Sequence, residues 1–104
     1  MRHILDETEY LLNSSKETTE NKFMHDETLQ RAYSRSLEII GEATKKLPKE
    51  FTEKHSEMDW SLMAGMRDKL MHHYFGVDYA IVWDVVKNEI PKLKPQIQEL
   101  IKKT

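Results

Sequence analysis

The chain has 104 residues, of which 38% are hydrophobic and 33% are charged, and its formal net charge is −2. This length fits one domain with a single core, and it leaves no room for a second domain. No apolar run reaches the roughly 18 residues of a membrane span, and the absence of cysteine excludes disulfides and thiolate metal sites. The N-terminal segment carries acids within its apolar face, unlike a signal peptide, so we expect a cytoplasmic protein.

The net negative charge also constrains any role in nucleic-acid binding. Proteins that bind phosphate backbones usually show a broad basic surface, and this composition does not provide one. If the protein acts on RNA, its positive field must be local or must be assembled from two subunits.

The first half of the chain predicts two long helices. Ile4, Leu5, Leu11 and Leu12 recur at helical spacing over about Arg2–Lys16, and the polar stretch NSSKETTEN predicts a loop after them. Asp26 is the expected N-cap of the second helix, which ends before Pro48 because the residue ahead of a proline disfavours the helical region. Its apolar stripe has a 4-3-4-3-4 spacing and consists of Leu29, Tyr33, Ser36, Ile40, Ala43 and Leu47.

The second half predicts a short helix and two more long ones. The stretch PKEFTEKHSEM indicates one or two helical turns followed by a polar connection. Asp59 is the expected N-cap of a long helix, WSLMAGMRDKLMHHYF, which Gly76 would end. Gly65 is expected inside that helix, where a glycine allows a neighbouring helix to approach closely. Asp78 then caps the final helix, in which two prolines predict a kink or break near Glu89–Lys94.

These elements predict an all-α fold in a single domain over residues 1–104. Its architecture is an up-and-down bundle of four main helices with one short additional helix. The apolar stripes leave more hydrophobic surface than a four-helix monomer needs, so we expect a homodimer with Trp60 as a candidate interface anchor. Four methionines are expected in the core: Met58, Met63, Met66 and Met71. Three histidines are expected at the surface: His3, His25 and His55.

The stretch MRDKLMHHYFGVD concentrates titratable groups in a segment that otherwise resembles a buried helix. On a helix, Tyr74 lies two turns beyond Arg67 on nearly the same stripe. His72 lies about 140° from Arg67 around the helix axis, and the long arginine side chain could reach it near the end of the helix. Histidine transfers protons near neutral pH, and arginine stabilises phosphate charge. Together they could cleave a phosphodiester without a metal, the histidine activating a ribose 2′-hydroxyl. His72 and His73 point to different faces, so at most one of them shares this cluster.

Structural interpretations of the same residues stay open at this point. A lone histidine in a helix is usually structural or exposed, and an arginine on an apolar face is usually paired with an acid. Glu38, Glu42 and Asp78 are available as such acids. Two adjacent histidines cannot bind one metal ion from one helical face, because helical ligand pairs need a spacing of three or four.

The spacing Arg67-x4-His72-x-Tyr74 resembles the motif of the HEPN superfamily. The flanking stretches SLEIIGEATKKLP and DWSLMAGMRDKLMHHYFGVDYAIVWDVVKNEIPKLK resemble the HepT-like toxin family, and the resemblance covers nearly the whole chain. It implies a small all-α homodimer that acts as a toxin ribonuclease without a metal or other cofactor. It also implies a partner, a minimal nucleotidyltransferase that serves as the antitoxin.

The resemblance also implies roles for single residues. Arg67 and His72 would carry RNA cleavage, and Tyr74 would be the tyrosine that the partner adenylylates. Asp68 stands where family members commonly have asparagine, which puts a negative charge beside the arginine, and His73 stands at a variable position. Candidate supporting residues are Asp68, His73 and Glu38. In the family's dimer, two copies of the arginine and histidine would line one locally positive cleft. The alternatives are a non-catalytic nucleotide- or RNA-binding module that partners the nucleotidyltransferase, and a purely structural helical dimer.

Overall fold

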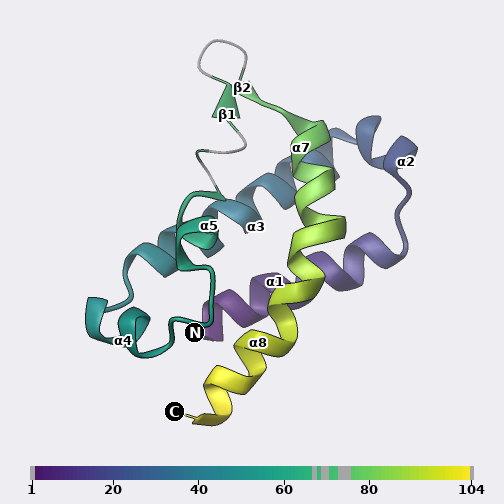
Figure 1. Ribbon diagram of the computed structural model, residues 1–104. Coiled ribbons are helices and arrows are strands. Elements are labelled where there is room, and N and C mark those ends of the chain that lie inside the picture. The colour runs from purple at the N-terminus through teal and green to yellow at the C-terminus, as the bar shows by residue number, and fades with distance from the viewer. Residues whose placement is uncertain (1, 67, 69–70, 73–75, 104) are drawn as a thin grey trace.

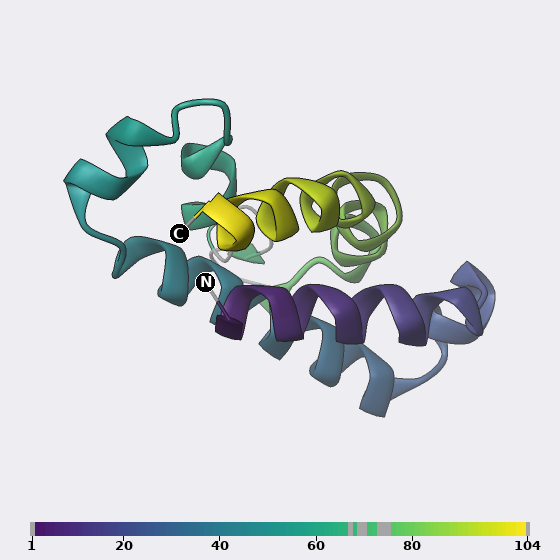
Figure 2. The ribbon, with the colours of Figure 1, turned by 90° about the horizontal axis from the view of Figure 1, so that it is seen from below.

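The computed structural model describes residues 2–66, 68, 71–72 and 76–103, and it is mostly helical. Helices α1 (Arg2–Lys16) and α3 (Glu27–Lys45) lie side by side and antiparallel, and the short α2 (Glu20–Met24) connects them (Figures 1 and 2). These two long helices form one layer of the molecule.

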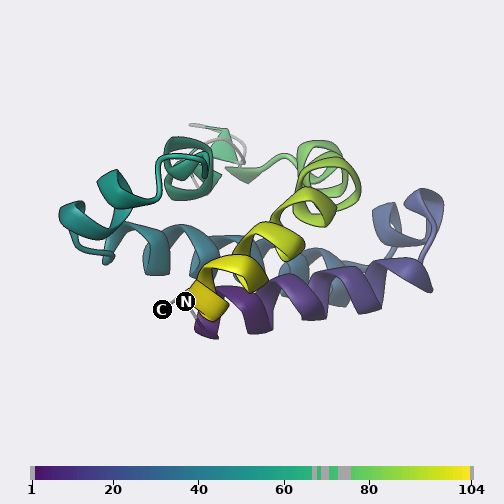
Figure 3. The ribbon, with the colours of Figure 1, turned by 60° about the horizontal axis from the view of Figure 1, so that its bottom comes forward.

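The rest of the chain forms a second layer over α1 and α3 (Figure 3). Helix α5 packs on α3, while a continuous helical run of α7, a π-helical segment η1, and α8 crosses over α3 and α1. The elements of this half are α4 (Lys49–Lys54), α5 (Trp60–Ala64), α7 (Tyr79–Asp84), η1 (Val85–Glu89) and α8 (Ile90–Lys103). Within the described ranges, no helix is both long and apolar enough to cross a membrane.

Three aspartates begin helices, as the sequence predicts. The carboxylates of Asp26 and Asp59 each accept a hydrogen bond from the backbone N–H three residues later, at 3.1 and 3.0 Å. Asp78 accepts from the N–H groups of Ala80 and Ile81 at 3.1 and 3.3 Å. Each carboxylate satisfies N–H groups that have no partner within the helix, which fixes where α3, α5 and α7 start.

An aromatic cluster joins the two layers. Phe23, the one buried residue of α2, stacks on Tyr33 of α3 with ring centroids 5.0 Å apart. Phe23 also contacts two rings of α7, Trp83 at 5.2 Å and Tyr79 at 6.5 Å. The hydroxyl of Tyr33 shares a 2.7 Å hydrogen bond with Ser14, so the same cluster also holds α1. The core therefore connects four helices through a few large side chains.

The loop predicted for NSSKETTEN is shorter in the structure. Helix α1 continues to Lys16 and α2 begins at Glu20, so only three residues separate the two helices. The hydroxyl of Thr19 caps α2 by accepting from the N–H of Lys22 at 3.1 Å. Burial of Phe23 then holds the five-residue helix in place, which the polar composition of the stretch does not indicate.

The prediction of one long helix between Asp59 and Gly76 is wrong. Helix α5 ends at Ala64, and Gly65 follows its last turn instead of lying in a helix interior, with its N–H bonded to the carbonyl of Ser61 at 3.0 Å. Further along, β1 (Met71–His72) and β2 (Gly76–Val77) pair antiparallel. Glycine is a weak helix former, and the aromatic and β-branched residues near Gly76 favour extended backbone.

This change alters the predicted architecture. Over the described residues the chain has three long helical stretches, namely α1, α3 and the run from α7 to α8, and not four. The all-α class holds in the sense that the molecule is mostly helical, with one two-stranded hairpin of two residues per strand.

In place of the break predicted near Glu89–Lys94, the structure has the π-helical segment η1, which ends at Glu89 and runs directly into α8. There the N–H of Ile90 bonds to the carbonyl of Val85, five residues back instead of four. Pro91 has no N–H and cannot donate the α-helical hydrogen bond to the carbonyl of the fourth residue back. The π-helical segment lies directly before this missing hydrogen bond. The ribbon bends between α7 and α8 (Figure 1).

The prediction that His55 lies at the surface is also wrong. Its side chain is 7% exposed, and its ring packs against Phe51 at 4.7 Å with Nδ1 3.7 Å from a carboxylate oxygen of Glu57. Its backbone carbonyl accepts the indole N–H of Trp60 at 2.8 Å, so this tryptophan has a partner within the chain. His3 and His25 are exposed as predicted. The core also contains three of the four predicted methionines, Met58, Met63 and Met66.

Candidate functional site

The Arg67-x4-His72-x-Tyr74 motif falls between α5 and α7, in the hairpin region at one end of the molecule (Figure 1). The structure describes the backbone of His72, which lies in β1 opposite Gly76 of β2. Arg67, His73 and Tyr74 lie outside the described residues. The helical spacing that would set His72 relative to Arg67 therefore does not apply, because His72 is in a strand.

Both ends of this segment are attached to the core. On one side, Met66 is helical and 1% exposed. On the other side, Val77 packs against the edge of the core and is followed by Asp78, whose carboxylate caps α7. The segment that carries the motif is thus held between a buried methionine and a capped helix start.

Gly76 has a backbone role that helical reasoning does not detect. Its φ is +80°, in the left-handed region that side chains other than glycine rarely adopt. A Cβ atom added at Gly76 would meet no atom within 4 Å, so the requirement for glycine comes from the backbone conformation alone. A glycine between an aromatic residue and Val77, shortly before a capping aspartate, was the available sequence signal for a hairpin.

Asp68 is helical and exposed. Its charge therefore lies in solvent, where water and salt reduce its effect on neighbouring groups. As the next residue after Arg67, it still adds a negative charge to the motif.

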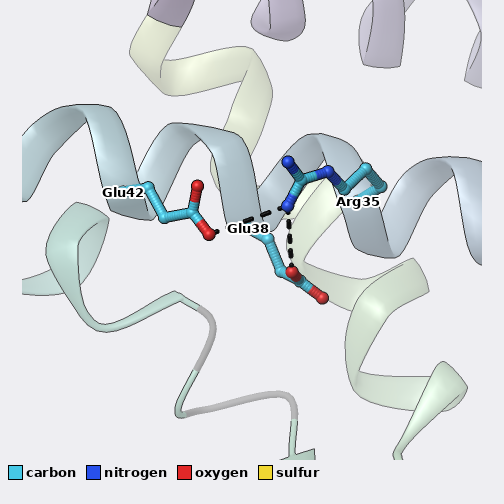
Figure 4. A network of polar contacts seen from close by, with 3 residues as sticks. All are labelled: Arg35, Glu38 and Glu42. Carbon is cyan, nitrogen blue, oxygen red and sulfur yellow. Dashed lines mark hydrogen bonds and ion pairs between the residues drawn. The ribbon is translucent and has the colours of Figure 1, made fainter.

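Glu38 has a partner on its own helix. The guanidinium of Arg35 lies 3.3 Å from Glu38 and 3.6 Å from Glu42, so the two carboxylates share one cation (Figure 4). All three side chains are partly or largely exposed, and ion pairs of this kind contribute little stability. The sequence offered Glu38 and Glu42 as ion-pair partners for Arg67. Among the described residues, both carboxylates pair with Arg35. Within those residues, no group of three or more histidines and acids could hold a metal ion.

Comparison with known proteins decides the family. Residues 4–100 match the family described as ribonuclease HepT-like. The chain belongs to this family. It is 52% identical over 103 residues to a protein of Caldanaerobacter subterraneus subsp. tengcongensis named "Putative RNase", covering 99% of this chain and 92% of that protein.

Two archaeal relatives extend the comparison. A protein of Thermococcus cleftensis named "Probable ribonuclease HepT" is 42% identical over 102 residues, covering 98% of this chain and 93% of its own. A "Putative RNase" of Methanocaldococcus jannaschii is 43% identical over 99 residues, covering 95% and 82%. No solved structure gives a significant match. The family and these relatives support a ribonuclease.

The positive φ of Gly76 leads to a first prediction. We expect Gly76→Ala to destabilise the β1–β2 hairpin, because an L-residue in the left-handed region costs about 1–2 kcal/mol. Amide hydrogen exchange at Met71 and Val77, which lie opposite each other, measures the effect. Gly76→Asn is the matched control, since asparagine tolerates this conformation better than alanine and should retain more protection. Equal protection in the wild type and Gly76→Ala would contradict the prediction.

Proposed function

We propose that the protein is a metal-independent endoribonuclease in which Arg67 and His72 carry the cleavage of RNA. The observation that supports this is the complete Arg67-x4-His72-x-Tyr74 motif in a chain of the ribonuclease HepT-like family. None of the three motif residues is substituted, and their side chains supply a proton acceptor, a permanent cation and a phenol.

In this mechanism, His72 accepts the proton of a ribose 2′-hydroxyl. The 2′-oxygen attacks the adjacent phosphorus, the bond to the 5′-oxygen breaks, and the leaving oxygen takes a proton from water. The products are a 2′,3′-cyclic phosphate and a 5′-hydroxyl. Arg67 stabilises the negative charge that grows on the phosphate oxygens during the attack.

The second part of the proposal is that two subunits form the active unit. Each chain has a net charge of −2, which opposes RNA binding, and a dimer would concentrate two copies of Arg67 and His72 in one cleft. A homodimer would therefore reconcile an acidic chain with an anionic substrate.

Light scattering at micromolar concentration tests the dimer. We expect a mass of twice 12.4 kDa, because the proposed cleft needs the arginine and histidine of two subunits. A single species of 12.4 kDa would contradict the dimer and leave each motif alone in its subunit.

The third part concerns regulation. We propose that the protein is the toxin of a toxin–antitoxin system and that a partner nucleotidyltransferase adenylylates Tyr74. The added AMP would place a phosphate close in sequence to Arg67, where it would compete with RNA for the same cation. The adenosine would also obstruct the cleft, so one modification would silence cleavage by charge and by bulk.

We expect Arg67→Ala and His72→Ala each to lower RNA cleavage by about 100-fold or more while the helical content stays the same. Arg31→Ala and His25→Ala are matched controls, since both residues are exposed and distant in sequence from the motif. Cleavage should persist in excess chelator and leave 2′,3′-cyclic ends, as chromatography of the products would show. Complete dependence on an added divalent metal would overturn the mechanism.

Co-expression with the neighbouring nucleotidyltransferase tests the modification. We expect intact-mass and peptide mass spectrometry to find one or more AMP units on Tyr74, and Tyr74→Phe to resist neutralisation. Tyr10→Phe is the control, because Tyr10 is 41% exposed and lies on α1, outside the motif segment. An unmodified Tyr74 in a fully neutralised complex would mean that the partner acts by binding alone.

A non-catalytic binding module is the second candidate. It is favoured by Asp68, an exposed carboxylate directly beside Arg67 where the family commonly has a neutral asparagine. Such a module would bind RNA or a nucleotide without cleaving it. Purified protein that binds RNA but shows no cleavage, with Asp68→Asn restoring activity, would support this alternative.

A further inference from the structure

The charges of the chain are unevenly distributed. Residues 2–30, which include α1 and α2, carry seven acids against three bases. Helix α8, in contrast, carries four lysines and a single acid, Glu99. A chain of net charge −2 thus has one strongly basic helix and one strongly acidic end.

The lysines of α8 lie on its solvent side. The buried stripe of this helix consists of Ile90, Leu93, Ile97 and Leu100. Lys92, Lys102 and Lys103 are exposed and Lys94 is half-buried. We call these four residues the α8 lysine face.

These lysines differ from several other cations of the molecule in their pairing. Arg31, Arg35 and Lys49 each lie within 4 Å of a carboxylate. Among the described residues, no lysine of the α8 lysine face forms an ion pair. Their charge is therefore available to an external anion.

The position of α8 leaves this face open. Apart from the adjoining η1, the helix packs chiefly on α1, and it crosses α1 on the side of the molecule that faces the viewer in Figure 3. Gln96 and Gln98 are also exposed, on the two flanks of the helix, and add amide donors, while Glu99 is the one exposed acid among these residues. From Lys92 to Lys103 the helix rises about 16 Å, which matches about five nucleotides of a stacked strand at about 3.4 Å each.

We propose that the α8 lysine face binds the phosphate backbone of RNA away from the cleavage motif. Lysine contacts with phosphates are independent of sequence, so this surface would hold RNA while the motif performs the chemistry. The acids of the N-terminal segment, which includes the helix α1 on which α8 packs, would repel the strand and so restrict how RNA can lie beside α8. The inference rests on the proposed function for the identity of the ligand.

A charge-neutralising variant tests this proposal. Lys92, Lys94, Lys102 and Lys103 are changed together to glutamine, and binding is measured by fluorescence anisotropy with a short 2′-O-methyl RNA, which lacks the attacking hydroxyl and cannot be cleaved. We expect affinity at about 0.1 M salt to fall about 10-fold or more, and the slope of log K against log salt to decrease by about 2–3. On cleavable RNA, KM should rise while kcat stays unchanged.

The matched control changes Lys45, Lys46, Lys49 and Lys54 to glutamine. These lysines are also exposed and their loss changes the net charge by the same amount, so binding should change by less than about twofold if position matters. Circular dichroism establishes that both variants fold.

Three results would overturn the proposal: an equal loss in both variants, unchanged RNA affinity in the α8 variant, or a loss confined to anionic phospholipid vesicles. Failure of the proposed function is a separate result, because it would show as wild-type protein that binds RNA without cleaving it, or as cleavage that survives Arg67→Ala and His72→Ala.

Discussion

The stack of Phe23 between Tyr33 and Trp83 is the contact on which the arrangement of this fold depends. It fixes α7 on α3, and Tyr33 extends the connection to α1 through Ser14. Because β2 leads through Val77 and Asp78 directly into α7, the position of the hairpin is set by the same stack. A change in the aromatic core would therefore reach the hairpin through α7.

Charge is distributed unevenly over the elements of the molecule. The unpaired cations of the α8 lysine face lie on a different element from the motif segment between α5 and α7. The N-terminal segment that includes α1 and α2 is acidic. In such an arrangement the net charge is a poor guide to nucleic-acid binding, because the local distribution of charge decides where an anion can lie.

The sequence predicts most of the helical framework because local rules govern it. Asp26, Asp59 and Asp78 cap helices because a short carboxylate reaches the N–H groups two or three residues on, and no tertiary information is needed to see this. The stripe of α8 likewise follows from apolar spacing alone. The prediction fails at Gly65, where α5 ends, and at Met71–His72 and Gly76–Val77, where a hairpin stands in place of helix, while Met66 and Asp68 are helical as predicted.

Local packing accounts for the burial of His55. Its ring contacts Phe51, four residues earlier, and its carbonyl accepts the indole N–H of Trp60, five residues later. The charged and polar neighbours of His55 in the sequence do not indicate this packing. Side-chain chemistry singles out Arg67, His72 and Tyr74, and resemblance to a family assigns their roles. Of these, His72 shows why spacing alone was insufficient: an angle measured on a helical wheel has no meaning for a residue in a strand.

The π-helical segment η1 lies between α7 and α8. It determines which side of α8 faces the core once the direction of α7 is fixed. Its extra residue per turn rotates everything that follows by about 100° relative to a continuous α-helix. Lys87 holds this turn in place, with its ammonium 3.4 Å from the carbonyl of Ser15 at the end of α1 and 5.4 Å from the centre of the Trp83 ring. Loss of a single residue within η1 would restore an ordinary helix and turn Leu93 and Ile97 out of their packing on α1. The one-residue insertion therefore lets α7 begin at the hairpin while α8 keeps its apolar side inward and its lysines outward.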